Sequence, residues 1–482
     1  MTVRGSVVGF LGAVALTACA VLLIYQAEPG QVSRGVSLFP WAVGLLLAAS
    51  VAYIVWQLDP AYGMSAAVVL SAFAGNWPKL GVPGPLSPDR LLLAAAILAV
   101  LLRSPASAER PKLQITGTHV LLALAATYAV ASALFVGTLT ENNSFLRLID
   151  TFGIMPFLLF LTAPLAFRTH AQRQILLVAF VVLGVYLGLI ALFETVRLDE
   201  LIFPKYIVDP SYGIHVGRGR GPFVEAVTNG LALFTCAVAC AIAVAQWRGP
   251  QARVIAGAVG LLCLVGSFLC LERSVWIAVT LATCIGMLAT RGARRYLVPV
   301  IVGLVVGLGA ALLFVPGLQE TVTERVDQKE TLWDRRNLAR AAINMVEAKP
   351  LLGFGWSRFQ KESADYFQQS ADFPLTATTF GVHNTPLAYA ADLGLVGVTL
   401  WALGLLFGVG GALLTRGPPD LLPWRIGLLS VAVATLIVIS AVPPSAWPNR
   451  AIWLLAGVVW SGRYAASQTS ERTRRAPASS VT

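Results

Sequence analysis

Residues 173–195 read RQILLVAFVVLGVYLGLIALFET, and between Gln174 and Glu194 this run carries no charged residue. An α-helix needs about 20 consecutive, mainly apolar residues to cross the hydrocarbon core of a bilayer. A strand of an outer-membrane barrel is instead about 10 residues long and alternates in polarity. The stretch therefore predicts a transmembrane helix, and it is one of many similar stretches along the chain.

The composition of the whole chain agrees with this interpretation. Of its 482 residues, 57% are hydrophobic and only 12% are charged, whereas a soluble domain carries about 25% charged residues. We therefore exclude a soluble enzyme, a disordered chain and a nucleic-acid-binding protein, although the net charge is +11. The predicted fold is an all-α, polytopic bundle of about 14 spans, with a range of about 12–14. The candidate spans are residues 6–26, 36–56, 62–78, 88–103, 116–137, 146–166, 173–195, 222–246, 254–271, 275–290, 296–315, 386–413, 424–441 and 449–462.

The third and fourth spans are the weakest, because they flank a segment rich in Pro and Gly from Pro78 to Pro88. Either of them is a candidate re-entrant segment.

The basic residues predict the orientation of the chain in the membrane. With the N-terminus in the cytoplasm, the short loops on that side are basic and nearly free of acids, which is the positive-inside pattern. An even number of spans places both termini in the cytoplasm. The outer face then carries the two long connections, at about 197–221 and 316–385.

These features divide the chain into four predicted parts. They are an N-terminal transmembrane bundle (1–315), an extracytoplasmic loop or cap domain (316–385), C-terminal transmembrane helices (386–464) and a disordered cytoplasmic tail (465–482). The loop is rich in aromatic residues, which is not typical of a disordered tether.

The long loop contains one segment with helical periodicity. Asp334 is a predicted N-cap for a helix that begins at Arg335 and ends near Lys349-Pro350, because Pro disfavours helical geometry in the residue before it. Arg335 lies at the centre of the apolar face, whereas Arg336 lies on the polar face. A guanidinium aimed at an apolar surface needs an anion there. The simpler interpretation is that Arg335, in the first turn, directs its side chain out to water.

Two further groups of arginines lie at the predicted outer surface. Arg218 and Arg220 belong to GRGRGPF (217–223), directly before a span. Glycine amides, arginines and a helix N-terminus suit a phosphate or diphosphate, although an interfacial anchor for anionic lipid headgroups fits equally well. Arg273 lies in the tight outer turn LERSVW (271–276), where pairing with the adjacent Glu272 is the simpler alternative.

Two acidic residues fall within predicted spans. Intramembrane acids such as Asp150 and Glu225 are functional candidates by default. Either of them could instead pair with an arginine from the outer side.

His383 precedes the twelfth predicted span, in VHNTP (382–386). Asn384 is a plausible N-cap and Pro386 suits a first helical turn. A histidine at a helix N-terminus is shifted toward its neutral form, which a general base requires. The alternative is that His383 only helps to cap the helix.

No cluster of residues has metal-ligand spacing and no phosphate-binding glycine loop occurs, so the sequence predicts no metal and no cofactor.

Three segments of the chain together resemble the O-antigen ligase and O-antigen polymerase superfamily of bacterial membrane glycosyltransferases. The likeness covers about residues 200–415, and it reaches the N-terminal spans only by hydropathy. Its specificity comes from the order, the spacing and the shared outer placement of the three motifs. They are His383-Asn384 followed by Gly394 and Gly397; Arg335 followed by PLLGFG (350–355); and Arg218-x-x-Gly221-x-Phe223 with Arg273-Ser274-Val275-Trp276 one hairpin later.

The resemblance implies a specific reaction. Members of the superfamily transfer a glycan from an undecaprenyl-diphosphate-linked donor to an acceptor hydroxyl, at the outer face of the cytoplasmic membrane and without a nucleotide sugar. The acceptor is a glycan or a lipid-linked molecule. By resemblance, His383 is the catalytic residue that activates the acceptor hydroxyl or assists the leaving diphosphate. The diphosphate and glycan are bound by Arg218, Arg220, Arg273 and Arg335, with Asn384, Glu225 and Trp276 in support.

The chemistry of the arginines agrees with the function that the resemblance implies. A diphosphate leaving group needs clustered cations to stabilise its developing charge. It also supplies the anion that Arg335 requires on an apolar helix face.

The chain departs from the family pattern at two places. Many relatives have Pro-Asn soon after the position of Phe223, where this chain has VEAVTN (224–229), and they often have a bulky aromatic residue where Ala339 stands. These departures leave the subgroup open, and a polymerase and a ligase differ only in the acceptor.

The alternative function is a transporter or flippase for a lipid-linked sugar or an anionic solute, with arginines as substrate clamps and His383 as a proton relay. Internal repeats, which many transporters show, are not visible.

Overall fold

The computed structural model describes residues 57–82, 87–102, 113–141, 144–213, 217–314, 330–367, 381–443 and 445–475, together with the single residues 54 and 323. Every regular element in these ranges is a helix, so the all-α prediction is confirmed there. The helices are α3 (Pro60–Leu70), α4 (Pro88–Leu102), α5 (Gly117–Phe135), α6 (Ser144–Arg147), α7 (Ile154–Ala166), α8 (His170–Thr195), α9 (Ala226–Gln246), α10 (Pro250–Leu269), α11 (Arg273–Ala289), α12 (Leu297–Phe314), α14 (Glu330–Ala348), α15 (Phe359–Glu362), α16 (Thr385–Leu405), α17 (Gly411–Leu413), α18 (Leu422–Ile439) and α19 (Ala446–Arg475).

Several of the described helices are long and apolar enough to cross a membrane. By length and composition there are seven of them, so a multi-pass membrane protein is confirmed and the predicted count of about 14 is not. The predicted span at 6–26 and nearly all of that at 36–56 lie outside the described residues. The seven candidate spans are Gly117–Phe135, Ser144–Ala166, His170–Thr195, Ala226–Gln246, Pro250–Leu269, Thr385–Leu413 and Pro419–Ile439.

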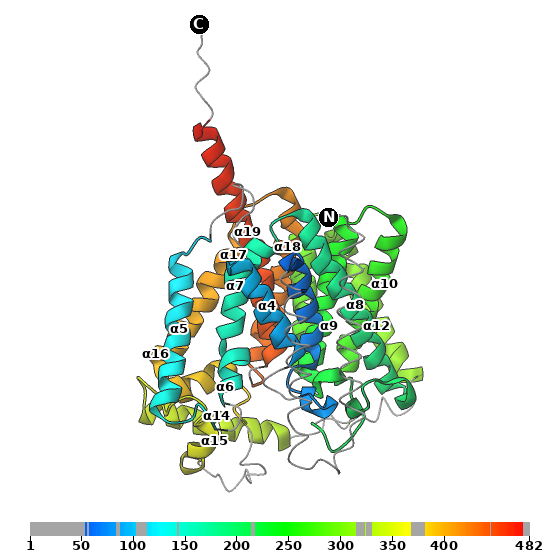
Figure 1. The fold of residues 1–482 in the computed structure, drawn as a ribbon. Helices are drawn as coiled ribbons and strands as arrows, with labels where there is room; N and C mark the ends of the chain where they lie inside the picture. Colours follow the sequence, from blue (N-terminus) through cyan, green and yellow to red (C-terminus); the bar gives the residue numbers. More distant parts are fainter. Residues whose placement is uncertain are drawn as a thin grey trace, which may run out of the picture.

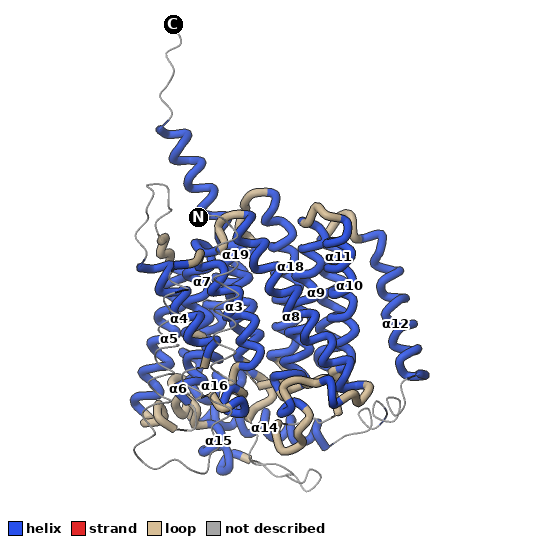
Figure 2. Tube along the Cα trace, turned by 45° about the vertical axis from the view of Figure 1, so that its right-hand side comes forward, coloured by secondary structure: helices blue, strands red, loops and turns tan. Residues whose placement is uncertain are grey.

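The long helices stand side by side, and the two ends of the bundle differ (Figure 1). α14 and α15 lie across one end, whereas α19 passes through the bundle and leaves at the opposite end. The connection from α11 to α12, which carries three arginines, lies at the same end as the exit of α19 (Figure 2). α12 stands at the edge of the bundle (Figure 2).

Aromatic side chains fill the space between α7 and α19. Trp453 and Trp460 of α19 are buried and meet Phe160 of α7 edge to face, with ring centroids 5.5 and 5.1 Å apart. Edge-to-face contact is a preferred geometry of aromatic pairs and adds to the stabilisation from their buried area. α19 is thereby fixed as a central helix.

The third predicted span does not form one continuous helix. α3 has 11 residues and rises about 16 Å, well short of the roughly 30 Å of the hydrocarbon core. Beyond Leu70 the chain continues as two short 3₁₀ segments, Ser71–Phe73 and Trp77–Leu80. A single helix across residues 62–78 is therefore not present, because the segment leaves α-helical geometry after Leu70, and the re-entrant alternative for this segment stays a prediction.

The helix predicted in the long loop is present as α14, with a different start. It begins at Glu330 rather than at Arg335, so Asp334 lies inside the helix and does not cap it. Residues 330–333 contain neither Gly nor Pro, and nothing in them stops the helix from extending backwards. Its end at Ala348, before Pro350, is as predicted.

The apolar face of α14 is buried as the periodicity predicts. Leu338, Ala342 and Met345 pack with Phe354, Phe359, Val382 and Ala391 in one small core. Arg336 and Arg340 are exposed on the other face. The described part of the long loop therefore folds against the first turns of α16.

The C-terminal helix also differs from the prediction. α19 continues to Arg475, whereas the sequence predicted a disordered tail from Ala465. Residues 465–475 are rich in Ala, Gln, Glu and Arg, which favour helix, and the next Pro is Pro477.

Candidate active site

α16 is broken near the middle of its length. Gly394 has a φ of 67° and a ψ of −174°, which are not helical values. A break of this kind frees backbone N–H and C=O groups that must find other partners in a buried setting. The segment 350–355 supplies them: Phe354 N donates to Ala391 O (3.0 Å), Gly355 N to Asp392 O (2.7 Å), Leu395 N to Pro350 O (2.7 Å) and Val396 N to Leu351 O (3.2 Å).

The close approach of these two backbones explains two glycines of the sequence motifs. A Cβ atom at Gly353 would overlap the backbone at Asp392 and Gly394. A Cβ atom at Gly394 would overlap the carbonyl group of Leu351. Two motifs that are about 40 residues apart in sequence are thus one backbone-bonded unit.

This unit brings His383 and Arg335 together, because His383 precedes α16 and Arg335 lies on the helix that leads into residues 350–355. Burial and the Arg335 guanidinium lower the pKa of His383, outweighing Asp334 and the Gly381 backbone, which raise it. The imidazole Nδ1 is buried and makes no hydrogen bond to the described residues. A half-buried, neutral imidazole beside a cation is the form that accepts a proton.

Asn384 is the N-cap of α16. Its side-chain oxygen accepts a hydrogen bond from Leu387 N (2.9 Å), which confirms the predicted N-cap. Its Nδ2 donates to the carbonyl of Ser440 (3.2 Å) and so ties α16 to the end of α18. His383 is therefore not engaged as the cap.

Arg218 is paired inside the protein. Its side chain is 3% exposed and forms an ion pair with Glu272. The alternative that Glu272 pairs with Arg273 does not hold: Arg273, the first residue of α11, is exposed, and none of the ion pairs found among the described residues includes it. Nearby, Trp276 Nε1 donates to Phe268 O (2.8 Å) across the α10–α11 turn.

Arg220 is occupied by backbone carbonyl groups. Its guanidinium donates to Ile207 O (2.8 Å), Asp209 O (2.8 Å) and Tyr212 O (2.6 Å), and the residue is 1% exposed. This burial excludes the interfacial lipid anchor for Arg220. It gives the residue a structural task, which is to hold the loop before α9.

Glu225 directly precedes the first residue of α9 and does not lie within this helix. The chain forms a short 3₁₀ turn at Gly221–Phe223, and Val224 has a φ of 56°, so α9 begins at Ala226 and not at 222 as predicted. The Glu225 carboxylate accepts a hydrogen bond from Thr228 Oγ1 (2.5 Å). Burial and the nearby Glu272 raise the pKa of Glu225, and the Thr228 hydrogen bond opposes them.

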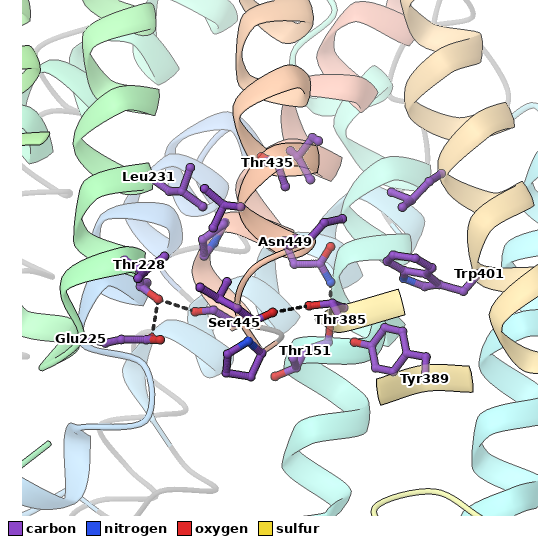
Figure 3. A pocket seen from close by; sticks show the side chains of 18 residues that line it. Thr151, Glu225, Thr228, Leu231, Thr385, Tyr389, Trp401, Thr435, Ser445 and Asn449 are labelled. Atoms are coloured by element: carbon purple, nitrogen blue, oxygen red, sulfur yellow. Dashed lines mark hydrogen bonds between the residues drawn. The ribbon is translucent and has the colours of Figure 1, made fainter. Parts of the chain in front are cut away.

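A pocket opens beside Glu225, between α9, α16, α18 and the start of α19 (Figure 3). We call it the Glu225 pocket. Thr385, the first residue of α16 and two positions after His383, forms part of its wall. It is lined by Thr151, Glu225, Val227, Thr228, Leu231, Thr385, Tyr389, Trp401, Leu405, Thr435, Val438, Ile439, Val442, Pro443, Ser445, Pro448, Asn449 and Ile452.

Comparison with known families places this geometry in context. Residues 258–402 match the O-antigen ligase family. The resemblance seen in the sequence is thereby confirmed over the segment that runs from α10 into α16. Comparison with curated proteins gave no match. The family match indicates glycan transfer of the O-antigen ligase or polymerase type by a membrane glycosyltransferase.

The O-antigen ligase segment contains five of the sequence-predicted site residues: Arg273, Trp276, Arg335, His383 and Asn384. Arg218, Arg220 and Glu225 lie before it. Within the described ranges, no three His, Cys, Asp or Glu side chains are grouped so that they could hold a metal ion.

A buried cluster of charged residues that lies outside residues 258–402 was not predicted from the sequence. Asp150 pairs with Arg90 and with Arg450, and Arg450 Nη1 also donates to Asp89 (2.7 Å). Asp150 thus follows the simpler alternative, a structural ion pair. Arg450 inside the predicted span 449–462 was the available signal, because a charged side chain within an apolar run requires a partner.

The hydroxyl and amide groups of the Glu225 pocket were also missed. Thr228, Ser445 and Asn449 are single polar residues within or between apolar runs, and no local pattern marks them. Only the packing of α9 against α18 and α19 brings them together.

Proposed function

We propose that this protein transfers a glycan from an undecaprenyl-diphosphate-linked donor to a hydroxyl group of a glycan or lipid-linked acceptor, at the outer face of the bacterial cytoplasmic membrane. The observation that carries the proposal is His383, which lies beside Arg335, has a lowered pKa and has a buried Nδ1 with no hydrogen bond to the described residues. Both residues lie in the segment that matches the O-antigen ligase family.

In the proposed reaction His383 acts as the general base. It takes the proton from the acceptor hydroxyl while that oxygen forms a bond to the anomeric carbon of the donor glycan. The bond from this carbon to the diphosphate oxygen breaks, and the electron pair leaves with the lipid diphosphate. The products are the lengthened glycan, the free lipid diphosphate and a proton that His383 returns to water.

We assign the diphosphate to Arg335 and Arg273. Arg335 is close enough to His383 to shift its pKa, and Arg273 is exposed at the start of α11. Two guanidinium groups placed where negative charge develops lower the barrier of the bond-breaking step. Arg218 then acts indirectly, since it holds Glu272 beside Arg273, and Arg220 maintains the loop before α9.

The proposed orientation places α14, α15 and His383 outside the cell and both termini in the cytoplasm. It is supported by the basic α11–α12 connection at the opposite end of the bundle, where α19 also exits (Figure 2).

The test is mass spectrometry of polyprenyl-diphosphate-linked glycans in a deletion strain that carries the wild-type protein, His383→Ala or His170→Ala. We expect His383→Ala to behave like the deletion, with a loss of product of at least about 100-fold, because a general base contributes about that much or more. Single repeat units accumulate if the protein is a polymerase, and long lipid-linked chains accumulate if it is a ligase.

His170 is the matched control, since it is exposed at the start of α8 and lies outside the segment 258–402. His170→Ala should retain product. An unchanged lipid-linked pool in the deletion strain, with all variants present in the membrane, contradicts glycan transfer and favours a transporter.

A further inference from the structure

The Glu225 pocket has the wrong charge for a diphosphate. Among the described residues that line it there is no Lys, Arg or His, and Glu225 is the one acidic residue. An anion placed there would lie beside a carboxylate in a setting of low dielectric constant, where like charges repel strongly. The pocket therefore fits a ligand that carries no negative charge.

The hydrogen bonds at the mouth of the pocket indicate what such a ligand must offer. Thr228 Oγ1 is 2.5 Å from Glu225 Oε2 and 2.7 Å from Ser445 Oγ. A hydroxyl group has one hydrogen to donate, and that of Thr228 is directed at the Glu225 carboxyl group. Thr228 therefore donates to Glu225, and Ser445 donates to Thr228. This leaves lone pairs of Ser445 and of the second Glu225 oxygen as acceptors for the hydroxyl hydrogens of a ligand.

The opposite wall is aromatic. Tyr389 and Trp401 of α16 face the pocket across from Glu225 and Thr228, and their ring centroids are 5.2 Å apart (Figure 3). A sugar ring has hydroxyl groups at its edge and C–H groups on its faces, so it can meet acceptors on one side and an aromatic surface on the other.

We propose that the Glu225 pocket binds an uncharged sugar ring of the acceptor, with the chain Glu225–Thr228–Ser445 selecting it through its hydroxyl groups. This inference rests on the proposed function. The acceptor is favoured over the donor sugar because the latter is bonded to a diphosphate, which this lining repels. Thr385 lines the pocket and lies two positions after His383. A hydroxyl group of a bound acceptor sugar near Thr385 would therefore lie on the side of the pocket that faces His383.

The probe that tests the pocket is a set of octyl glycosides (glucoside, galactoside, mannoside and N-acetylglucosaminide), each carrying a diazirine on the alkyl chain. Each is irradiated with the purified protein in lipid nanodiscs, and labelled peptides are identified by mass spectrometry. We expect at least one glycoside to label residues 225–231 and 435–452 more strongly than an octyl phosphate with the same diazirine. Thr228→Val and Ser445→Ala should each reduce that labelling about fivefold or more, since one hydrogen bond is worth about 1 kcal/mol.

Thr435→Val is the matched control, because Thr435 lines the pocket at the end away from Glu225 (Figure 3). It should leave the labelling unchanged, as should His383→Ala. Equal labelling by octyl phosphate, no labelling by any glycoside, or equal labelling of wild type, Thr228→Val and Ser445→Ala would overturn the proposal. The labelling does not require turnover, so this test and the His383 test of glycan transfer fail independently.

Discussion

At the scale of single residues, the arginines that look alike in sequence have different environments. Arg220 is enclosed by three carbonyl groups and Arg218 by a carboxylate, whereas Arg273 is exposed and Arg335 acts on His383. A buried guanidinium that is held by carbonyl or carboxylate groups contributes to folding rather than to ligand binding. The proposed diphosphate site is accordingly smaller than the four arginines predicted from sequence.

The pH dependence of transfer follows from the environment of His383. A base works only when it is unprotonated, so kcat/KM should fall as the pH drops through the pKa of His383 and stay flat above it. Because the pKa is lowered from its ordinary value of 6.5, this acid limb should lie below pH 6.5. Asp334→Asn removes a charge that raises the pKa and should shift the limb to still lower pH.

A pH–rate profile of the purified protein checks this prediction, with Asp365→Asn as the control because Asp365 is exposed on the adjacent η9 turn (Ser363–Tyr366). An acid limb above pH 6.5, or a shift of the limb to higher pH in Asp334→Asn, contradicts the assignment.

At the scale of elements, the break in α16 decides how the cap is attached. Residues 350–355 complete the hydrogen bonds that Gly394 interrupts, and α14 is thereby held over His383. A continuous α16 would have no free backbone groups for this segment. The broken helix and the docked segment are therefore one structural device that positions Arg335.

Gly394→Ala should destabilise the protein. An alanine at a φ of 67° costs about 1–3 kcal/mol, and its Cβ would also overlap the Leu351 carbonyl group. We expect a loss of several degrees in the unfolding temperature of the detergent-solubilised protein and a loss of transfer activity. Gly257→Ala in α10 is the control, since its added Cβ meets nothing closer than 3.9 Å. Equal unfolding temperatures for Gly394→Ala and Gly257→Ala would show that the break carries no strain for a side chain.

At the scale of the whole molecule, one buried charge cluster joins distant parts of the bundle. Arg450 of α19 contacts Asp89 of α4 and Asp150 of the π-helical turn at Leu148–Phe152, and Arg90 pairs with the same Asp150. The two positive and two negative charges balance. α19 also provides Asn449 to the Glu225 pocket, so the cluster fixes the helix that forms one of its walls.

Arg450→Met should destabilise the fold by roughly 3–5 kcal/mol, because it leaves two buried carboxylates facing one arginine. Adding Asp89→Asn to this variant removes one of these charges and should recover part of the loss. Chemical denaturation in detergent measures both effects. The exposed Arg340→Met is the control and should change the stability by less than about 0.5 kcal/mol. An Arg450→Met protein as stable as the control contradicts a stabilising role of the cluster.

The sequence by itself determined the features that depend on local pattern. Apolar run length gave the membrane helices, periodicity gave the buried face of α14, and short-range capping rules gave Asn384 and the end of α14 before Pro350. The motifs around Arg335 and His383 also sufficed for the resemblance that the family match confirms. Each of these follows from residues that are close together in the chain.

Only the tertiary structure decided which polar groups meet. Arg218 pairs with Glu272 across 54 positions, and Arg450 with Asp89 across 361. The Glu225 pocket likewise draws its hydroxyl groups from separate helices. Such partners depend on which helix faces come together during packing, and packing is governed by the shape of whole apolar surfaces. A short polar motif carries no information about that choice, so the sequence could propose these residues but not their partners.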